Sequence, residues 1–296
     1  MKFASYLQAP FTDEDAMIKR LPYPLNAVTQ TISLPALSRQ TLHDSLKESA
    51  SSKVREHPTV AFFAGCVTDY AYPNIGHDVM KVLREYGAEP YFPAEQTCCG
   101  APAFYAGDVE TALSLAKVNI TAIERDNPDY IVTVCPGCAV MLKQEYLGLT
   151  AHEPEWHRRA QAISGKVRDF SQLILELNPV SEKKPPRNRK ITYHDPCHLK
   201  RGLGIDSEPR VLLEHEGFEL VEMVDSDACC GFGGETLLNY PELSNSVLQR
   251  KLDNIEATGA DTVITNCVPC ILQIRGGLDK RHSNIKVMHT AELLAR

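Results

Sequence analysis

No apolar run in this sequence of 296 residues approaches the roughly 20 residues that cross a bilayer. The segment from Met1 to Ser5 meets polar residues before the apolar core of a signal peptide could form. Basic residues are not in excess, because the formal net charge is -7, and this argues against nucleic acid as a partner. We therefore expect a cytoplasmic protein that binds no nucleic acid.

Other common signatures are also missing from the sequence. We find no Ser-His-Asp hydrolase pattern, no Walker phosphate loop and no flavin fingerprint. Hydrophobic residues make up 43% and charged residues 23% of the chain, a balance that excludes disordered and collagen-like proteins. At roughly 150 residues per domain, the length favours two domains.

What the sequence does contain is ten cysteines, arranged as two groups of five in the same order. Each group has a single cysteine, then an adjacent pair followed by glycine, then a Cys-x-x-Cys motif. In a reducing cytoplasm such thiols indicate metal ligands or redox groups more than disulfides. The groups are Cys66, Cys98, Cys99, Cys135 and Cys138, and Cys197, Cys229, Cys230, Cys267 and Cys270.

The similarity between the two groups extends beyond the cysteines. Residues 128–135 align with 260–267, and residues 166–174 align with 286–294. An internal duplication explains both alignments. We accordingly place an N-terminal extension at 1–57, a first copy at 58–182, a linker at 183–189 and a second copy at 190–296.

Strand and helix patterns alternate along both copies. We predict strands at 60–63, 89–92, 130–134, 190–193, 219–223, 262–265 and 285–288, and helices at 74–86, 208–215, 242–257, 271–278 and 291–295, with others beginning at 108 and within 135–138. This predicts an α/β fold of two homologous, pseudo-symmetric Rossmann-like domains, each a short parallel sheet flanked by helices. The cysteines then lie at the carboxyl edge of the strands, where open α/β sheets bind ligands.

Thiolates select iron-sulfur clusters, zinc or copper(I). A structural zinc ion and a cubane cluster each take four ligands, so five cysteines per copy exceed what either needs. Spacing and number therefore favour a multi-iron cluster in each copy. Two zinc sites, or a cluster in one copy and zinc in the other, remain open.

The doubled pattern of Cys, Cys-Cys-Gly and Cys-x-x-Cys resembles the cysteine-rich CCG domain family. That family includes heterodisulfide reductase catalytic subunits and the iron-sulfur subunits of lactate, glycolate and glycerol-3-phosphate oxidation systems. Local runs at 72–76, 96–100 and 194–198 are more similar to the lactate and glycolate branch. The resemblance implies that the ten cysteines bind two noncubane [4Fe-4S] clusters.

The resemblance also implies a function. We expect an oxidoreductase subunit that relays electrons between a quinone or other carrier and a flavin-containing partner oxidising lactate, glycolate or glycerol-3-phosphate. One alternative is a heterodisulfide reductase-like subunit that reduces a disulfide at the clusters. Another, of a different class, is a zinc-stapled scaffold without redox activity.

The first 57 residues contain no cysteine, whereas relatives of the glycolate type carry a ferredoxin-like segment at that place. Either a separate ferredoxin-like subunit supplies the clusters of that segment, or this chain is the carboxyl part of a split gene, and we favour a split or stand-alone version. The partners expected are then a flavoprotein dehydrogenase subunit and a ferredoxin-like iron-sulfur subunit. Association with the inner face of the membrane would come through such partners. His194 and His198 flank Cys197, and we consider them for proton transfer or for contacts around the cluster.

Overall fold

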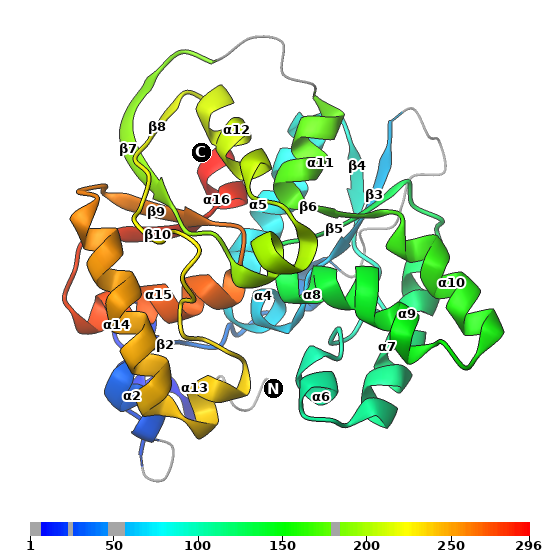
Figure 1. Ribbon diagram of the computed structural model, residues 1–296, viewed down its shortest axis with the longest axis horizontal. Helices are drawn as coiled ribbons and strands as arrows, with labels where there is room; N and C mark the ends of the chain where they lie inside the picture. Colours follow the sequence, from blue (N-terminus) through cyan, green and yellow to red (C-terminus); the bar gives the residue numbers. More distant parts are fainter. Residues whose placement is uncertain (1–6, 23–25, 47–56, 179–183) are drawn as a thin grey trace.

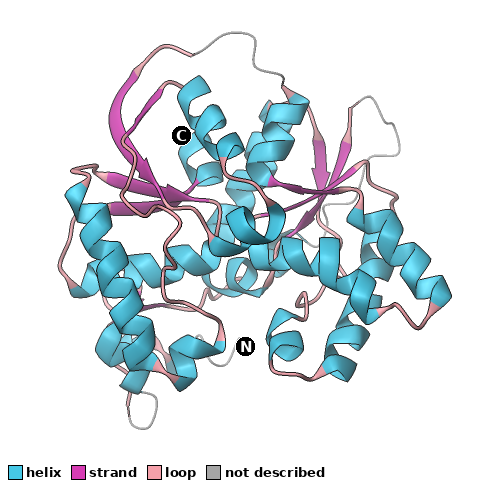
Figure 2. Ribbon diagram, in the orientation of Figure 1, coloured by secondary structure: helices cyan, strands magenta, loops and turns pink. Residues whose placement is uncertain are grey.

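The computed structural model describes residues 7–22, 26–46, 57–178 and 184–296. The chain forms two α/β lobes, each built on a four-stranded sheet, with helices around and between the sheets (Figures 1 and 2). All strand pairs in both sheets are parallel. This confirms the predicted fold class.

The two sheets have the same topology. In the first copy the order is β4-β3-β5-β6, and in the second it is β8-β7-β9-β10. Numbered within each copy, both orders are 2-1-3-4, which is the topology that the duplication predicts. The strands are β3 (Thr59–Phe63), β4 (Glu89–Tyr91), β5 (Tyr130–Thr133), β6 (Val167–Asp169), β7 (Arg187–Tyr193), β8 (Phe218–Leu220), β9 (Thr262–Thr265) and β10 (Lys286–His289).

The first copy is the richer of the two in helix. A helical run that includes a π-helical segment follows β5, and a further helix precedes β6. The elements are α4 (Cys66–Ala71), α5 (Pro73–Glu85), α6 (Ala101–Tyr105), α7 (Val109–Glu124), α8 (Pro136–Val140), the π-helix η2 (Met141–Glu145), α9 (Tyr146–Leu149), α10 (Pro154–Ser164) and α11 (Phe170–Leu177).

The second copy repeats this plan with fewer insertions. A π-helical segment directly follows Cys197, and a single long helix follows Cys267. The elements are the π-helix η3 (His198–Gly202), α12 (Ser207–His215), α13 (Glu235–Asn239), α14 (Pro241–Ala257), α15 (Val268–Lys280) and α16 (Thr290–Leu294).

Most predicted elements are present, and the differences are at their ends. Strand β7 begins at Arg187, inside the segment predicted as linker, and β8 covers Phe218–Leu220 where we expected 219–223. Helix α15 begins at Val268 because Cys267 is its extended N-cap and Pro269 is tolerated in the first turn. The short helices α6 and α13, each following a cysteine pair, were not predicted.

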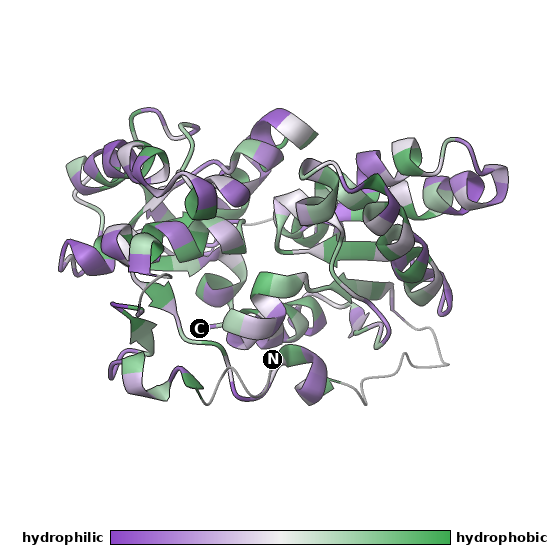
Figure 3. Ribbon diagram, turned by 90° about the horizontal axis from the view of Figure 1, so that it is seen from below, coloured by the Kyte–Doolittle hydropathy of each residue, from purple (hydrophilic) through white to green (hydrophobic). Residues whose placement is uncertain are grey.

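The two copies pack through helices that correspond by the duplication. Helix α5 of the first copy contacts α16 of the second, and α12 of the second contacts α11 of the first. One hydrophobic core runs through this interface and includes Val60 and Phe62 of the first sheet and Ile191 and Tyr193 of the second. Hydrophobic residues are concentrated along the strands, while the outer helices carry hydrophilic faces (Figure 3). The copies therefore form one body.

The N-terminal segment contacts both copies. It contains η1 (Ala9–Phe11), α2 (Asn26–Thr31), α3 (Leu42–Leu46) and an antiparallel pair of β1 (Met17–Ile18) and β2 (Leu34–Pro35). Helix α2 packs on α14, and α3 packs on α4 and α5. Among the described residues, no helix combines the length and the apolar character that a membrane crossing requires.

Candidate metal centre

The structure gathers the ten cysteines into the two predicted groups of five. All ten are free thiols. Cys66 follows β3 and Cys135 follows β5, the two neighbouring strands at which the order of the first sheet reverses. Cys197 after β7 and Cys267 after β9 occupy the same place in the second sheet. Loop peptides at such a switch point converge on one crevice, which brings together residues far apart in sequence.

Interactions between thiols link the sulfurs of each group in the same order. In the first site the order is Cys66, Cys98, Cys99, Cys138, Cys135. In the second site it is Cys197, Cys229, Cys230, Cys270, Cys267, with 3.5 Å between the Cys230 and Cys270 sulfurs. The two cysteines of each adjacent pair therefore have different neighbouring sulfurs. Binding to different atoms of one larger metal group requires such an arrangement.

The first cysteine of each adjacent pair is poised to ionise. Interactions with the Cys66 and Cys99 thiols lower the pKa of Cys98 to about 3. Corresponding interactions with Cys197 and Cys230 lower the pKa of Cys229 to about 2, and the Gly231 N–H donates to the Cys229 sulfur at 3.3 Å. Since thiolate is the form that binds metal, both sites are prepared for a soft cation.

Glycines allow the sulfurs to come close to the backbone. Gly65 has a φ of +74°, and a Cβ placed on it would lie 2.9 Å from the Cys138 sulfur. Gly231 has a φ of +90°, and its Cβ would lie 2.4 Å from the Ser244 carbonyl oxygen. Any other residue would be strained at these two positions and would displace a neighbouring group.

Buried polar side chains from corresponding helices hold the two loops that carry the cysteine pairs. In the first copy Asn119 of α7 accepts a hydrogen bond from the Thr97 N–H at 2.8 Å and donates to the Cys98 carbonyl at 2.9 Å. The Tyr146 hydroxyl donates to the Cys99 carbonyl at 3.0 Å. These contacts fix the backbone around both sulfurs of the pair.

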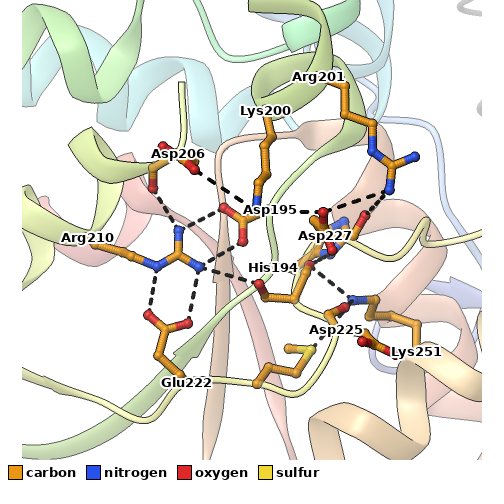
Figure 4. Close-up of polar contacts among 12 residues, drawn as sticks. His194, Asp195, Lys200, Arg201, Asp206, Arg210, Glu222, Asp225, Asp227 and Lys251 are labelled. Atoms are coloured by element: carbon orange, nitrogen blue, oxygen red, sulfur yellow. Dashed lines mark hydrogen bonds and ion pairs between the residues drawn. The ribbon is translucent and has the colours of Figure 1, made fainter. Parts of the chain in front are cut away.

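In the second copy Lys251 of α14 takes the place of Asn119. Its ammonium group donates to the carbonyls of Asp225 and Ser226 at 2.8 and 3.1 Å, and its side chain is fully buried (Figure 4). Desolvation lowers the pKa of Lys251 to about 8. The ammonium group of Lys251 thus lies beside the second site, where the first copy has the neutral side chain of Asn119.

His194 and Asp195 lie between β7 and Cys197, and both are buried. Asp195 forms a two-bond ion pair with Arg210 at 2.8 and 2.7 Å. Burial alone would raise the pKa of Asp195, but these bonds keep it below its ordinary value. Burial and the Lys251 charge lower the pKa of His194 to about 3, so its ring is neutral at neutral pH. His198 lies next to the site, with its Nδ1 3.6 Å from the Cys197 sulfur.

Sequence reasoning identified the cysteines and the two histidines but missed Asn119, Tyr146 and Lys251. A signal for Lys251 is present, because it lies on the face of α14 that carries Leu248, Leu252 and Ile255. A lysine at such a position is rarely buried without a specific partner. A buried polar residue within an apolar helix face is therefore the pattern to look for.

The two sites lie on the sides of their copies that meet. Helix α8, which carries Cys138, packs on η3, which follows Cys197. The corresponding contact joins α15, which carries Cys270, to α4, which begins at Cys66. Each site therefore borders a helix that belongs to the other.

Comparison with known proteins gives consistent matches. A model of the CCG cysteine-rich domain matches twice, over residues 60–143 and 191–275. Lactate utilization protein A of Exiguobacterium sp. is 36% identical over 238 residues, 80% of this chain and 97% of that protein. Lactate utilization protein A of Shouchella clausii is 36% identical over 236 residues, 79% of this chain and 98% of that protein.

Among solved structures, the crystal structure of a hypothetical protein from Helicobacter pylori matches with a TM-score of 0.55. The identity is 12%, and the match covers 85% of this chain and 52% of that chain. At this identity the likeness concerns the fold alone.

Proposed function

This chain belongs to the CCG cysteine-rich domain family, and on that premise we propose that it is an iron-sulfur electron-transfer subunit of a lactate oxidation system. The observation that carries the proposal is the doubled set of five sulfurs, brought together in the same order at two sheet edges. The relatives named lactate utilization protein A support lactate as the substrate class.

The donor set fits an iron-sulfur group better than zinc. Five thiols meet at each site, one more than a tetrahedral ion binds. Each set of five would hold one [4Fe-4S] cluster, which we propose to be of the noncubane type because two adjacent cysteines contribute. When bound, such a cluster takes up and releases one electron at a time.

The chain's own residues set the surroundings in which that exchange takes place. Two cysteines of the first site, Cys99 and Cys138, and three of the second, Cys230, Cys267 and Cys270, are buried, so the protein excludes water from part of each site. The Gly231 N–H directed at the Cys229 sulfur stabilises negative charge there. Burial and N–H···S bonds are the means by which proteins adjust the potential of such groups.

We propose that the electrons come from a flavoprotein dehydrogenase subunit and pass, through a ferredoxin-like iron-sulfur subunit, to a quinone or another carrier. The described residues offer thiol sites but no flavin fingerprint, so the oxidation of the 2-hydroxy acid would take place on the partner. Association with the cytoplasmic face of the membrane would likewise come through that complex.

The test is anaerobic electron transfer from the partner. The cluster-loaded chain is mixed with a candidate flavoprotein dehydrogenase from the same organism, and L-lactate is added under argon. The proposal predicts bleaching of the iron-sulfur absorption that depends on both lactate and flavoprotein. Bleaching by dithionite but not by lactate with the flavoprotein would contradict it.

A second candidate is reduction of a disulfide, because α8 and η3 bring the two sites together across the interface. Two one-electron groups side by side could supply the two electrons that cleave an S–S bond into two thiols. Anaerobically reduced protein mixed with a mixed disulfide of two small thiols would then release two thiols per disulfide. Protein that is reoxidised by a quinone but not by the disulfide favours the relay.

A further inference from the structure

The two sites differ at one buried position next to the sulfurs. By the offset that relates Cys66 to Cys197, Phe63 of the first copy corresponds to His194 of the second. Phe63 is fully buried and packs in the same apolar cluster as Cys99 and Cys138. His194 takes its place beside the corresponding sulfurs, since its ring nitrogen and the Cys230 and Cys270 sulfurs all lie within 4.8 Å of one another.

The tautomer of His194 follows from its hydrogen bond. Its Nδ1 lies 3.2 Å from the Ser226 carbonyl oxygen, which only accepts hydrogen bonds, so Nδ1 carries the proton. In a neutral ring Nε2 then presents a lone pair. Among the residues that the structure describes, the buried Nε2 has no hydrogen-bond partner. Leaving a buried nitrogen unpaired is costly unless something else occupies it.

Further contacts hold the carbonyl that orients the ring. The Ser226 oxygen also accepts a hydrogen bond from the Asp195 N–H at 3.0 Å and from the Lys251 ammonium at 3.1 Å. Figure 4 shows His194 and Lys251 close to the loop that follows β8 and contains Asp225. A histidine that donates one ring N–H to a fixed carbonyl, keeps its other ring nitrogen unpaired and lies beside two thiols has the arrangement typical of metal-binding histidines.

We propose that His194 is a ligand of the second site, binding through Nε2 the metal that Cys230 and Cys270 hold. The inference rests on the proposed function for the identity of the metal, an iron of the cluster, and its chemical class is mixed thiolate and imidazole ligation. The first site has only sulfur ligands, because Phe63 offers no donor atom. The duplication has therefore produced two sites with different ligand sets.

A difference in electron affinity follows from a charge beside the second site. Imidazole is neutral, so as a ligand added to five thiolates it leaves the net charge of the cluster unchanged. Lys251, where the first copy has Asn119, adds a positive charge on the same side. We expect the second site to accept electrons first, which would give the two sites a fixed order in the electron path.

The test is nitrogen hyperfine spectroscopy of reduced protein with one site intact. The Cys98→Ser, Cys99→Ser double variant keeps only the second site, and the Cys229→Ser, Cys230→Ser double variant keeps only the first. We expect strong nitrogen coupling in the former, altered by labelling with ¹⁵N-histidine, and none in the latter. Isotope labelling requires no substitution at His194, so this measurement does not depend on whether a His194 variant folds.

Two substitutions complete the test in the protein that keeps only the second site. His194→Phe reproduces the residue of the first copy and should abolish the coupling, while His198→Phe should leave the coupling unchanged. A cluster without histidine coupling, or coupling that survives His194→Phe, overturns the inference and leaves the proposed function intact.

If the second site takes up zinc and no iron, the proposed function fails for that site. Whether His194 binds the metal can still be measured. X-ray absorption at the zinc edge then reports the ligands directly. A nitrogen neighbour lost in His194→Phe supports the inference, and sulfur neighbours alone overturn it.

Discussion

The hydroxyl of Tyr105 in the first copy lies 3.4 Å from Nε2 of His198 in the second. Tyr105 ends the short helix α6 that follows Cys98 and Cys99, and the His198 ring lies against the Cys197 sulfur. Burial and the charges of Glu145, Cys99 and Cys197 raise the pKa of Tyr105, so thiols of both sites act on this one side chain. The two candidate centres are thus neighbours across the interface.

This proximity predicts magnetic interaction between the two clusters. In fully reduced wild-type protein, we expect electron paramagnetic resonance signals broadened by coupling between the sites. Each double variant that keeps only one site should give a narrower signal. If the wild-type spectrum equals the sum of the spectra of the two variants, the sites do not interact as the Tyr105 and His198 contact implies.

The equivalence of the two sites predicts that each can be lost independently. Cys99→Ser should remove the first cluster and Cys230→Ser the second, because each residue is a buried cysteine that interacts with two other sulfurs of its set. Iron content should fall by about half in either variant. Each variant is the control for the other, and full iron content in both would refute binding by five thiolates.

The close approach of backbone to sulfur at Gly65 can be tested with a matched glycine. Gly65 and Gly87 have φ values of +74° and +79°, so alanine strains the backbone at either position, by about 1–3 kcal/mol. An added Cβ meets the Cys138 sulfur at 2.9 Å only in Gly65→Ala, since nothing lies within 4 Å in Gly87→Ala. Iron analysis should show loss of the first cluster in Gly65→Ala alone. Equal iron content in the two variants would contradict the geometry.

A buried carboxyl at the interface predicts a pH dependence of stability. Asp169 caps α11 and accepts a hydrogen bond from Asn266 at 2.9 Å, and burial raises its pKa from 3.8 to about 6. The folded chain therefore binds this proton more tightly than the unfolded chain. Its contribution to the free energy of unfolding falls as pH rises from 3.8 to about 6, by up to about 3 kcal/mol, and stays low above that pH.

Asp169→Asn keeps the accepting oxygen and removes the charge, so its gain in stability over wild type should grow across this pH window. Denaturant unfolding of metal-free protein measures the difference. Asp108→Asn is the control of opposite sign, because hydrogen bonds from Thr111 hold the pKa of Asp108 below its ordinary value. A wild-type to Asp169→Asn difference that does not vary with pH would show that Asp169 is not desolvated.

The parts of the structure predictable from sequence are those that repeat. Equal cysteine spacing and the aligned strands predicted two copies of one sheet, and β9 occurs at Thr262–Thr265 as expected. The start of β7 at Arg187 was not predictable, because the charged residues before Ile191 look like a solvated linker. Pairing with β8 extends the strand through them.

The candidate site was predictable in its sulfurs and less so in what surrounds them. Cysteine spacing is visible in the chain, whereas the roles of Asn119 and Lys251 depend on which loop passes over the helix. His194 was noted only as a neighbour of Cys197. Its lone pair could be assigned only once the contact with the Ser226 carbonyl was known.

Iron, zinc and acid-labile sulfide, measured per chain in anaerobically purified protein, decide whether each set of five cysteines holds an iron-sulfur cluster. We predict brown protein with about eight irons and a matching amount of sulfide, four of each per site. Colourless protein with stoichiometric zinc and no acid-labile sulfide would contradict it.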